Sequence, residues 1–475
     1  MSRRKKPLPF FEKLEITDAG AEGKCITRVD EKVIFVPFAA PGDIVDIQVT
    51  KKRKSYLEGR ITKFHEYSEQ REDPRCSHFG LCGGCKWQHI KYLNQLTNKQ
   101  KQVKDNFDRI AKVPVGEFLP IIGADNEYYY RNKLEFTFSD RRWLTNMDTS
   151  KEEGGPKNTD GLGFHLPGRF DKILDIDNCY LQKDPSNDIR LAIRKYALDH
   201  EFDFYNVRNH EGFLRNLIIR TSSTGELMVI LVFRYDDMDI GTMLKDIIEK
   251  FPEITSLMYV VNEKQNDTIW DLEIKLAHGK PYLLEEMKSP SNNDILKFKI
   301  GPVSFYQTNP EQAFKLYKVA FDFANFKGDE LVYDLYTGTG TIAAFIAKSA
   351  NKVVGIEYIE EAIAGAKENA EYNNIDNVEF FAGDIVKVLT PEFVNSNGQP
   401  DIIITDPPRA GMHEKVVKQI LVIEPEKIVY VSCNPSTQAR DISLLSEKYD
   451  VLKSQSVDMF PQTHHVENVA LLVKR

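Results

Sequence analysis

A cysteine ends an apolar run near the C-terminus of the chain. The run KIVYVS, residues 427–432, is followed by Cys433, Asn434 and Pro435. A continuous apolar, β-branched run predicts a parallel strand covered on both faces. Pro435 cannot donate a ladder hydrogen bond and disfavours a helical Asn434, so Cys433 is predicted to lie where the strand opens into a loop. Because ligands bind at that edge of a doubly wound sheet, Cys433 is a candidate nucleophile; the alternative is a small buried apolar residue.

A carboxylate and two histidines precede the last predicted strand, where PQTHHVENVALL contains His464, His465 and Glu467. Carbon 5 of a pyrimidine is a poor nucleophile, but a thiolate that adds at carbon 6 makes carbon 5 nucleophilic. A base must then remove the carbon 5 proton so that the thiolate can leave. Cys433 and Glu467 are candidates for this nucleophile and this base, while the histidine pair is alternatively a polar loop. Because only a thiolate adds, we expect a lowered pKa for Cys433.

A glycine loop follows an earlier buried run. In VYDLYTGTGT, residues 332–341, Gly338 and Gly340 let a ligand approach the backbone closely. The helix predicted beyond them offers free N–H groups. Ala343 stands where a G-x-G-x-x-G motif has its third glycine, so the loop gives weak support to an NAD pyrophosphate site.

Three acidic residues end the predicted strands around this loop. Glu357 closes VVGIE and can accept hydrogen bonds from two ribose hydroxyls, as in the S-adenosylmethionine sites of doubly wound methyltransferases. Asp384, in AGD, is a candidate contact for adenine, and Asp406, in TDPPRAG, is held at the same edge by a loop that two prolines stiffen. The alternative is a structural turn with a surface carboxylate. The Asp-Pro-Pro loop also occurs in enzymes that methylate exocyclic amines.

Three cysteines gather near residue 80. The stretch CSHFGLCGGC contains Cys76, Cys82 and Cys85 in a C-x5-C-x2-C spacing, which is typical of a loop that wraps a soft metal. A fourth ligand is needed, and Cys179 is the candidate apart from Cys25 and the strand-end cysteine. The spacing does not separate a [4Fe–4S] cluster from a four-cysteine zinc site, which is the second hypothesis. The three-cysteine loop of radical enzymes, C-x3-C-x2-C, has a different spacing.

The composition is that of a globular protein with more than one core. The 475 residues are 41% hydrophobic and 28% charged, and no apolar run is long enough for a membrane span. MSRRKKPLPF is basic but no apolar stretch follows, so we expect no secretory signal and a cytoplasmic protein. Residues 1–65 hold 14 Lys and Arg against 9 Asp and Glu, although the whole chain has a net charge of −8. This basic head predicts a local contact with a polyanion.

Three regions differ in their pattern. Residues 1–66 alternate short β-rich runs with turns and predict a small OB-like β-barrel. Residues 67–310 mix the cysteine loop, a polar helix, strand-like runs and an exposed loop over 145–161, and predict a mixed α+β domain. Residues 311–475 alternate strands and helices, which predicts a doubly wound α/β domain with a parallel sheet.

These motifs together resemble the bacterial RNA (uracil-5-)-methyltransferase family, in its cluster-bearing 23S rRNA branch, over essentially the whole chain. Residues 1–66 resemble its RNA-binding TRAM barrel, and the C-terminal region its class I S-adenosylmethionine-dependent domain. CSHFGLCGGCKWQH resembles its [4Fe–4S] ligand loop, which favours iron–sulfur over zinc. The resemblance implies Cys433 as nucleophile, Glu467 as base, Gln307, Tyr336, Glu357 and Asp406 as cofactor contacts, Cys76, Cys82, Cys85 and Cys179 as cluster ligands, and Arg131 and Lys133 as RNA contacts.

The resemblance does not name the target nucleotide. Family members methylate different uridines of 23S rRNA or the T-loop uridine of tRNA, and the tRNA enzymes generally lack the barrel and the cluster. A uridine of 23S rRNA is therefore the expected substrate, with tRNA as the alternative. An exocyclic-amine methyltransferase, which would leave Cys433 idle, and a non-catalytic RNA-binding iron–sulfur protein are the two rival hypotheses. We expect neither a membrane nor an obligate protein partner.

Overall fold

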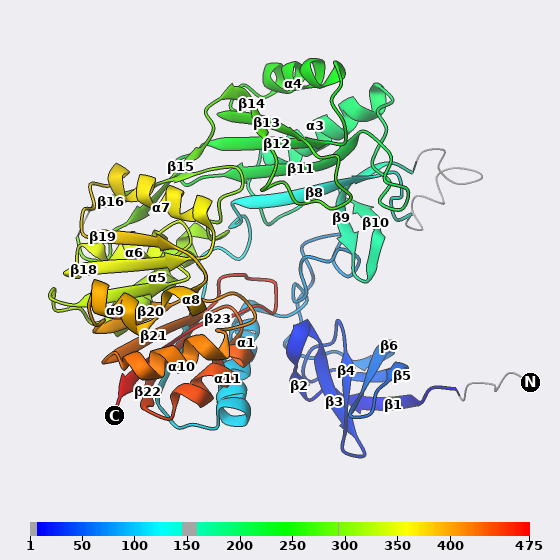
Figure 1. The fold of residues 1–475 in the computed structure, drawn as a ribbon. Helices are drawn as coiled ribbons and strands as arrows, with labels where there is room; N and C mark the ends of the chain where they lie inside the picture. The colour runs from blue at the N-terminus through cyan, green and yellow to red at the C-terminus, as the bar shows by residue number, and fades with distance from the viewer. Residues whose placement is uncertain (1–6, 145–158, 293) are drawn as a thin grey trace, which may run out of the picture.

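The computed structural model describes residues 7–144, 159–292 and 294–475, which form three parts (Figure 1). An N-terminal barrel, drawn in blue, lies below a central domain and beside a C-terminal domain. The part of the chain described contains no helix that is both long and apolar enough to cross a membrane. The loop predicted over 145–161 lies mostly outside the described residues.

The N-terminal part is a six-stranded sheet in the order β1-β5-β6-β4-β3-β2, curled around its own apolar core (Figure 1). Cys25 is fully buried in this core, and its thiol donates a hydrogen bond to the carbonyl of Ala39 at 3.0 Å. The elements are β1 (Phe10–Glu15), β2 (Asp18–Ala19), η1 (Ala21–Gly23), β3 (Cys25–Val29), β4 (Lys32–Val36), β5 (Ile44–Lys52) and β6 (Tyr56–Glu66).

The central domain is a seven-stranded sheet in the order β10-β9-β8-β11-β12-β13-β14, with α3 and α4 packed on one face. A separate hairpin, β15-β16, leads toward the C-terminal domain (Figure 1). The elements are β8 (Lys133–Ser139), β9 (Gly161–Leu166), β10 (Arg169–Asp175), α3 (Ser186–Asp199), β11 (Leu214–Thr221), β12 (Leu227–Phe233), α4 (Asp239–Lys250), β13 (Ser256–Val261), β14 (Ile274–Gly279), β15 (Leu283–Lys288) and β16 (Ile295–Ile300).

The C-terminal domain contains an eight-stranded sheet in the order β19-β18-β17-β20-β21-β23-β22-β7. The strands from β19 to β21 are parallel, and β23 pairs antiparallel with β21 and β22. The elements are α5 (Pro310–Ala324), β17 (Leu331–Leu335), α6 (Thr341–Ala347), β18 (Lys352–Glu357), α7 (Glu360–Tyr372), β19 (Val378–Ala382), α8 (Ile385–Val388), α9 (Pro391–Asn397), β20 (Ile402–Thr405), α10 (Glu414–Ile423), β21 (Lys427–Ser432), α11 (Pro435–Leu445), β22 (Tyr449–Val457) and β23 (Glu467–Lys474).

Helices cover both faces of this sheet, which confirms the predicted doubly wound α/β fold. Residues of α5, α6 and α7 share one apolar core with the strands, and residues of α8, α10 and α11 share the other. The central strand β20, with the sequence IIIT, is buried along its whole length, as its continuous apolar run predicts.

A segment from before the central sheet completes the C-terminal domain. It consists of α1 (Tyr92–Asn106), the short helix η2 (Phe107–Ala111) and β7 (Val115–Ile122). β7 pairs in parallel with β22 and forms the edge of the sheet, while Val103 and Phe107 pack into the core beneath α11. The predicted domain boundaries at 66 and 310 stay predictions, but residues 92–122 lie with the third part of the chain.

Polar contacts join the barrel to the rest of the molecule. Arg71, just after β6, forms an ion pair with the buried carboxylate of Asp43 at 2.7 Å. The indole of Trp87 donates to the carbonyl of Gly23 at 3.2 Å, and Lys101 of α1 pairs with Asp18 at 2.5 Å. These contacts fix one side of the barrel against α1 and the residues that precede it.

Candidate active site

Neighbouring parallel strands end at one edge of the C-terminal sheet. Tyr336 follows β17, Glu357 ends β18, Asp406 follows β20 and Cys433 follows β21. Because the carboxyl ends of parallel strands meet at one edge, all four predicted site residues lie along the same crevice. Tyr336 has a φ of 64°, in the left-handed region that a tyrosine rarely adopts, and strain of this kind is common at functional sites.

The loop after β21 has the conformation that its sequence predicts. Asn434 adopts an extended conformation, and its side chain accepts a hydrogen bond from the amide of Ser436 at 3.2 Å, so it caps α11. Pro435 occupies the first position of that helix, where a missing N–H is tolerated. Cys433 is therefore the single residue between a buried strand and a helix cap, and it is half-buried.

Strand pairing brings Glu467 opposite Cys433. Ser432, at the end of β21, pairs with Asn468, so the next residue outward on each strand is Cys433 and Glu467. Glu467 is only 4% exposed. A thiol and a carboxyl, separated by more than thirty residues in the sequence, thus face each other at the edge of the sheet.

The electrostatic surroundings of Cys433 differ from the expectation. Burial, together with the nearby carboxyls of Glu467 and Asp406, raises the pKa of the Cys433 thiol to about 11, although Arg409 acts in the opposite direction. The predicted lowering of this pKa is therefore wrong for the protein without its ligands. A positive charge or the loss of a negative one is needed before the thiolate forms readily.

The carboxyls of this edge are also shifted. Burial raises the pKa of Glu467 well above its usual value, with Asp406 adding to the shift and Arg409 opposing it. Burial raises the pKa of Asp406 to about 7, and that of Asp334, within β17, to about 7. Several carboxyls near one another in a poorly hydrated site are poised to bind a cation or to exchange protons near neutral pH.

Comparisons with known proteins agree with this geometry. The family model described as tRNA (Uracil-5-)-methyltransferase matches residues 272–475, and the TRAM domain model matches residues 13–62. A Bacteroides thetaiotaomicron protein described as an uncharacterized RNA methyltransferase is 55% identical over 96% of this chain and 100% of its own length. A protein of the same description from Porphyromonas gingivalis is 53% identical over 97% of this chain and 99% of its own length.

The chain belongs to the RNA (uracil-5-)-methyltransferase family. Among solved structures, it is similar to the Pyrococcus abyssi tRNA (uracil-54, C5)-methyltransferase in complex with S-adenosyl-L-homocysteine. The two are 29% identical and superpose with a TM-score of 0.73. The match covers 97% of this chain and 100% of the other. This similarity and the matched TRAM domain confirm the predicted class I methyltransferase fold with an N-terminal barrel.

The glycine loop of this methyltransferase leaves room beside its backbone. Gly338 has a φ of 55°, and no atom lies within 4 Å of the position that a Cβ would take there. Glu357 accepts hydrogen bonds from the amides of Gly338 at 3.1 Å and Tyr358 at 2.8 Å, so its carboxylate is fixed at the loop. Asp384 caps the short helix α8 by accepting from the amide of Val386 at 3.0 Å.

Gln307 reaches the same edge from the loop before α5. Its carbonyl accepts a hydrogen bond from the side chain of Asn132 at 3.1 Å. Its side chain is near enough to Tyr317 to lower the pKa of that hydroxyl. Burial raises the pKa of Tyr317, and the nearby carboxyls of Asp406, Asp334 and Glu467 add to that shift. Through Tyr317, Gln307 is thus near these three carboxyls, although it lies far from Asp406 and Glu467 in the sequence.

The four predicted cluster cysteines lie in one region of the molecule. Cys85 interacts electrostatically with Cys76, Cys82 and Cys179, and burial with these neighbours raises the pKa of Cys85 to about 12. The amide of Cys179 donates to the side chain of Asn187 at 2.8 Å. Within residues 7–144, 159–292 and 294–475, no group of three or more His, Cys, Asp or Glu side chains is arranged to hold a metal ion.

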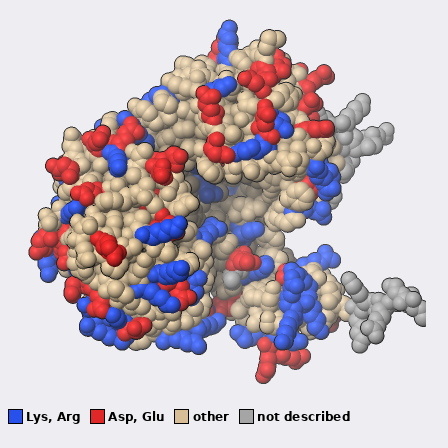
Figure 2. All heavy atoms as spheres, in the orientation of Figure 1, with Lys and Arg blue, Asp and Glu red and all other residues tan. Residues whose placement is uncertain are grey.

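A cleft of about 780 Å³ separates the barrel from the C-terminal domain and reaches Cys433. The barrel contributes Arg28 and Phe35, and α1 and η2 contribute a second wall. Arg409 and His464 lie on the side of Cys433. Figure 2 shows Lys and Arg side chains gathered on the barrel and along the edge of the hollow between the barrel and the two other domains.

The two predicted RNA contacts lie elsewhere. Arg131 stands over the ring of Phe460 at 5.7 Å, and it lines a smaller pocket of the central domain. Lys133 begins β8, and its backbone lies opposite that of Arg220 in the neighbouring strand β11. Burial lowers the pKa of Lys133. Neither residue lines the cleft that reaches Cys433.

Two residues of the site were not singled out from the sequence. Asp334 lies in the middle of β17, fully buried, and accepts a hydrogen bond from the hydroxyl of Thr337 at 2.5 Å. An aspartate within an apolar run was the available signal, because charged residues are rarely fully buried unless paired, and buried titratable groups with shifted pKa values gather at functional sites. Arg409, in the Asp-Pro-Pro-Arg loop, lowers the pKa values of both Cys433 and Glu467. No spacing in the sequence indicates this.

Proposed function

We propose that this enzyme methylates carbon 5 of a uridine in RNA through a covalent adduct of Cys433. The observation that carries the proposal is the pairing of β21 with β23, which sets the thiol and the Glu467 carboxyl opposite each other. An enzyme that methylates an exocyclic amine needs neither group, because nitrogen has its own lone pair. The paired thiol and carboxyl therefore favour carbon 5 chemistry over that rival.

The proposed reaction runs in three steps. The thiolate of Cys433 bonds to carbon 6 of the flipped-out uracil, and carbon 5 becomes an enolate-type nucleophile. S-adenosylmethionine, when bound, supplies the methyl group that carbon 5 takes up. Glu467 then accepts the carbon 5 proton, the bond between sulfur and carbon 6 breaks, and the thiolate of Cys433 is regenerated.

The raised pKa of Glu467 suits this role. A carboxylate whose pKa lies well above its usual value is a stronger base than an exposed one, so it removes a carbon-bound proton more readily. Arg409 opposes the shift and so helps to keep a fraction of the carboxyl ionised. Glu467 must be ionised when it takes up the carbon 5 proton, and binding of a cationic ligand next to Asp406 would favour this state.

We propose Gln307, Tyr336, Glu357, Asp384 and Asp406 as the residues that contact S-adenosylmethionine. The open space beside Gly338 leaves room for a ligand against the backbone. Glu357 is suited to ribose hydroxyls, and Asp384, after β19, to the adenine end. The buried carboxyl of Asp406 is suited to the positively charged end of the ligand. The Pyrococcus abyssi structure contains S-adenosyl-L-homocysteine, which supports this class of ligand.

We propose that Cys76, Cys82, Cys85 and Cys179 hold a [4Fe–4S] cluster. Three of these cysteines belong to one loop, Cys179 comes from the segment before α3, and all four are partly buried and interact electrostatically. Thiolates are the ligands that iron–sulfur clusters take. With a cysteine on every iron, no position is open for chemistry. The role of such a cluster would be to order the loop, and four-cysteine zinc is the alternative.

The expected RNA is 23S rRNA, with tRNA as the second candidate. The TRAM barrel and the four candidate cluster cysteines favour rRNA through the resemblance described above. The similar Pyrococcus abyssi enzyme is named for uracil 54 of tRNA, and this observation favours the second candidate. Arginines and carboxylates both line the cleft between the barrel and the C-terminal domain. The Lys and Arg side chains on the barrel beside it suit either polyanion. Arg131 and Lys133 remain proposed as further RNA contacts, and the cytoplasm as the compartment.

Mass mapping of rRNA and tRNA from a deletion strain tests the proposal. The wild-type gene, Cys433→Ala and Glu467→Gln are each returned to that strain. Loss of one 5-methyluridine in 23S rRNA, restored by the wild type alone, is the expected result. Loss of the mark in tRNA instead would overturn the rRNA assignment but not the chemistry. Full restoration by Cys433→Ala would overturn the nucleophile.

A further inference from the structure

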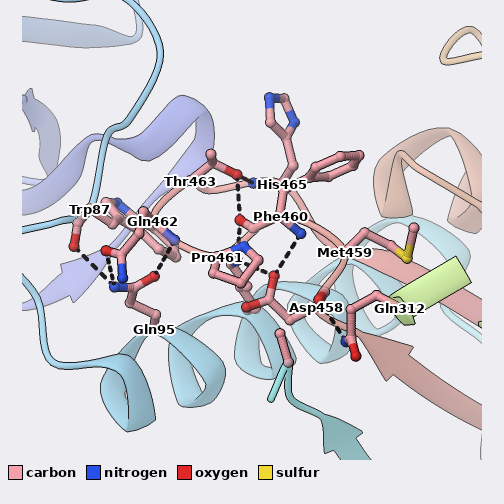
Figure 3. Close-up of polar contacts among 12 residues, drawn as sticks. Trp87, Gln95, Gln312, Asp458, Met459, Phe460, Pro461, Gln462, Thr463 and His465 are labelled. Carbon is pink, nitrogen blue, oxygen red and sulfur yellow. Dashed lines mark hydrogen bonds and ion pairs between the residues drawn. The ribbon is translucent and has the colours of Figure 1, made fainter. Parts of the chain in front are cut away.

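The base loop, residues 458–466, joins β22 to β23 and leads directly into Glu467 (Figure 3). It has no helix or strand of its own, yet most of its residues are buried. A buried loop must have partners for its backbone polar groups, because unpaired ones are costly away from water. The partners of the base loop come from α1, α5 and the segments next to them.

The first partner is a fully buried ion pair. The ammonium of Lys99, on α1, contacts a carboxylate oxygen of Asp458 at 2.6 Å, and both side chains are 0% exposed. Lys99 also donates to the carbonyl of Phe460 at 3.1 Å, and the amide of Phe460 donates to the Asp458 carboxylate at 3.1 Å. The hydroxyl of Tyr92, about two turns earlier on α1, donates to the other carboxylate oxygen at 3.0 Å. One buried lysine thus fixes the first turn of the base loop.

The second partner is a reciprocal amide pair. The side chain of Gln95 donates to the side-chain oxygen of Gln462 at 3.0 Å and accepts from the backbone amide of Gln462 at 3.0 Å. The amides of Lys86 and Trp87 donate to the carbonyl of Gln462 at 2.9 and 3.0 Å. Gln462 has a φ of 66°, a left-handed conformation that persists only where the surroundings impose it. Four hydrogen bonds at one residue supply that constraint.

The opposite side of the loop is held from α5. The side chain of Asn309 donates to the carbonyl of Met459 at 3.0 Å. The side chain of Gln312 donates to the carbonyl of Asp458 at 2.8 Å (Figure 3). Asn309 follows the loop that contains Gln307, so the same short segment approaches the proposed cofactor site and the base loop. The base loop is therefore clamped between two helices.

We infer that Lys99 and Gln95, through Asp458 and Gln462, are positioning residues that hold Glu467 opposite Cys433. This inference rests on the proposed function of Glu467. Proton removal requires the carboxylate to stand within hydrogen-bond reach of carbon 5, and an error of about 1 Å in such a geometry can lower a rate by ~100-fold. Neither Lys99 nor Gln95 contacts the reacting atoms.

The contacts point to positioning more than to stability. Replacing a buried ion pair by apolar side chains often leaves stability unchanged or improves it, so such a pair is weak evidence for stabilisation. Lys99 and Gln95 instead each contact a backbone atom of the base loop, at Phe460 and at Gln462. Gln95 also donates to the carbonyls of Trp87 and Ile90 at 3.1 and 2.8 Å, so it ties the base loop to the segment before α1. A positioning role predicts a specific kinetic defect, whereas a structural role predicts a general loss of folded enzyme.

The test separates proton removal from the steps before it. Purified full-length Lys99→Met and Gln95→Met are incubated with S-adenosylmethionine and the RNA that the mass mapping identifies. The covalent RNA–protein adduct is followed on denaturing gels. Gln95→Met introduces no unpaired buried charge and serves if Lys99→Met does not fold. Arg215→Met is the matched control. The guanidinium of Arg215 is buried in the central sheet and donates to the carbonyls of Asn262 and Asn266, away from the base loop.

If the clamp positions Glu467, both variants show kcat lowered by about 10- to 100-fold, KM for RNA changed by less than about threefold, and a rise in the methylated adduct. Glu467→Gln should give the same adduct, and Arg215→Met should give none above the wild type. If Glu467→Gln traps adduct but neither variant does, the positioning inference is wrong and the proposed function stands. If Glu467→Gln traps no adduct and Cys433→Ala keeps activity, the proposed function fails and the inference fails with it.

Discussion

Cys433 and Glu467 face each other because Ser432 pairs with Asn468 in the antiparallel contact of β21 and β23. Cys433 directly follows the last residue of β21, and Glu467 is the first residue of β23, so both lie one position beyond that pair. Such a pairing holds the two groups more rigidly than two loops would, since the strands on both sides are buried. The relationship also couples their charges, because each carboxylate near the thiol raises its pKa.

The reactivity of Cys433 should rise steeply with pH in the protein without ligands. With a pKa of about 11, the thiolate fraction rises about tenfold per pH unit between pH 8 and pH 10, so the rate of alkylation by iodoacetamide should rise roughly 90-fold. Asp406→Asn removes one negative neighbour and should raise the rate at pH 8. Mass spectrometry of the Cys433 peptide measures both rates. A rate that levels off below pH 10 would contradict the raised pKa.

Asp334 should make the stability of the protein depend on pH. Its pKa is raised to about 7 in the folded protein, against about 3.9 when unfolded. Its contribution to stability is therefore full below about pH 4 and is lost as the pH rises through 7. The fall in the free energy of unfolding between pH 5 and pH 8 should be smaller in Asp334→Asn by about 2 kcal/mol. Urea unfolding measures this, and Asp329→Asn, at an exposed site, should follow the wild type.

Binding of S-adenosyl-L-homocysteine should depend on Glu357. Glu357→Gln loses the charged acceptor at the glycine loop and should weaken the affinity by about 10- to 100-fold, the usual cost of a hydrogen bond to a charged group. Isothermal titration calorimetry measures the change. Glu379→Gln, on the neighbouring strand and paired with Lys352, is the control and should bind normally. Equal affinities for Glu357→Gln and the control would remove Glu357 from the ligand site.

Anaerobically purified protein should contain iron and acid-labile sulfide, about four of each per chain for a [4Fe–4S] cluster. Cys85→Ser should lose most of both. Cys25→Ala is the matched control, because Cys25 is buried in the barrel core and should leave the metal content unchanged. Zinc in place of iron would support the four-cysteine zinc alternative, and no bound metal would reject both.

The cleft beside the barrel should bind the RNA backbone. Arg28→Ala should weaken RNA binding by a few-fold and lower the salt dependence of the affinity by about one unit of slope, as the loss of one phosphate contact does. Filter binding at several salt concentrations measures the slope. Lys245→Ala, on α4 of the central domain, removes an exposed lysine outside the cleft and should leave the slope unchanged.

Local patterns in the sequence were sufficient for the elements and for the ends of the strands. The apolar run before Cys433, the proline that follows it and the glycines after β17 each act within a few residues, and the structure has them as predicted. The carboxyl ends of parallel strands share an edge by the rules of the fold, so Glu357 and Asp406 could be assigned to one edge without coordinates.

The tertiary structure decided which distant segments meet. Nothing in the sequence indicates that β7 pairs with β22, or that the polar helix α1 buries Lys99 against Asp458, because these contacts join residues more than 300 apart. It also reversed the expected pKa of Cys433, since a pKa depends on burial and on charges brought near by folding. The sequence alone determined the chemical groups and the sheet edge at which they lie; folding determined how they are held and charged.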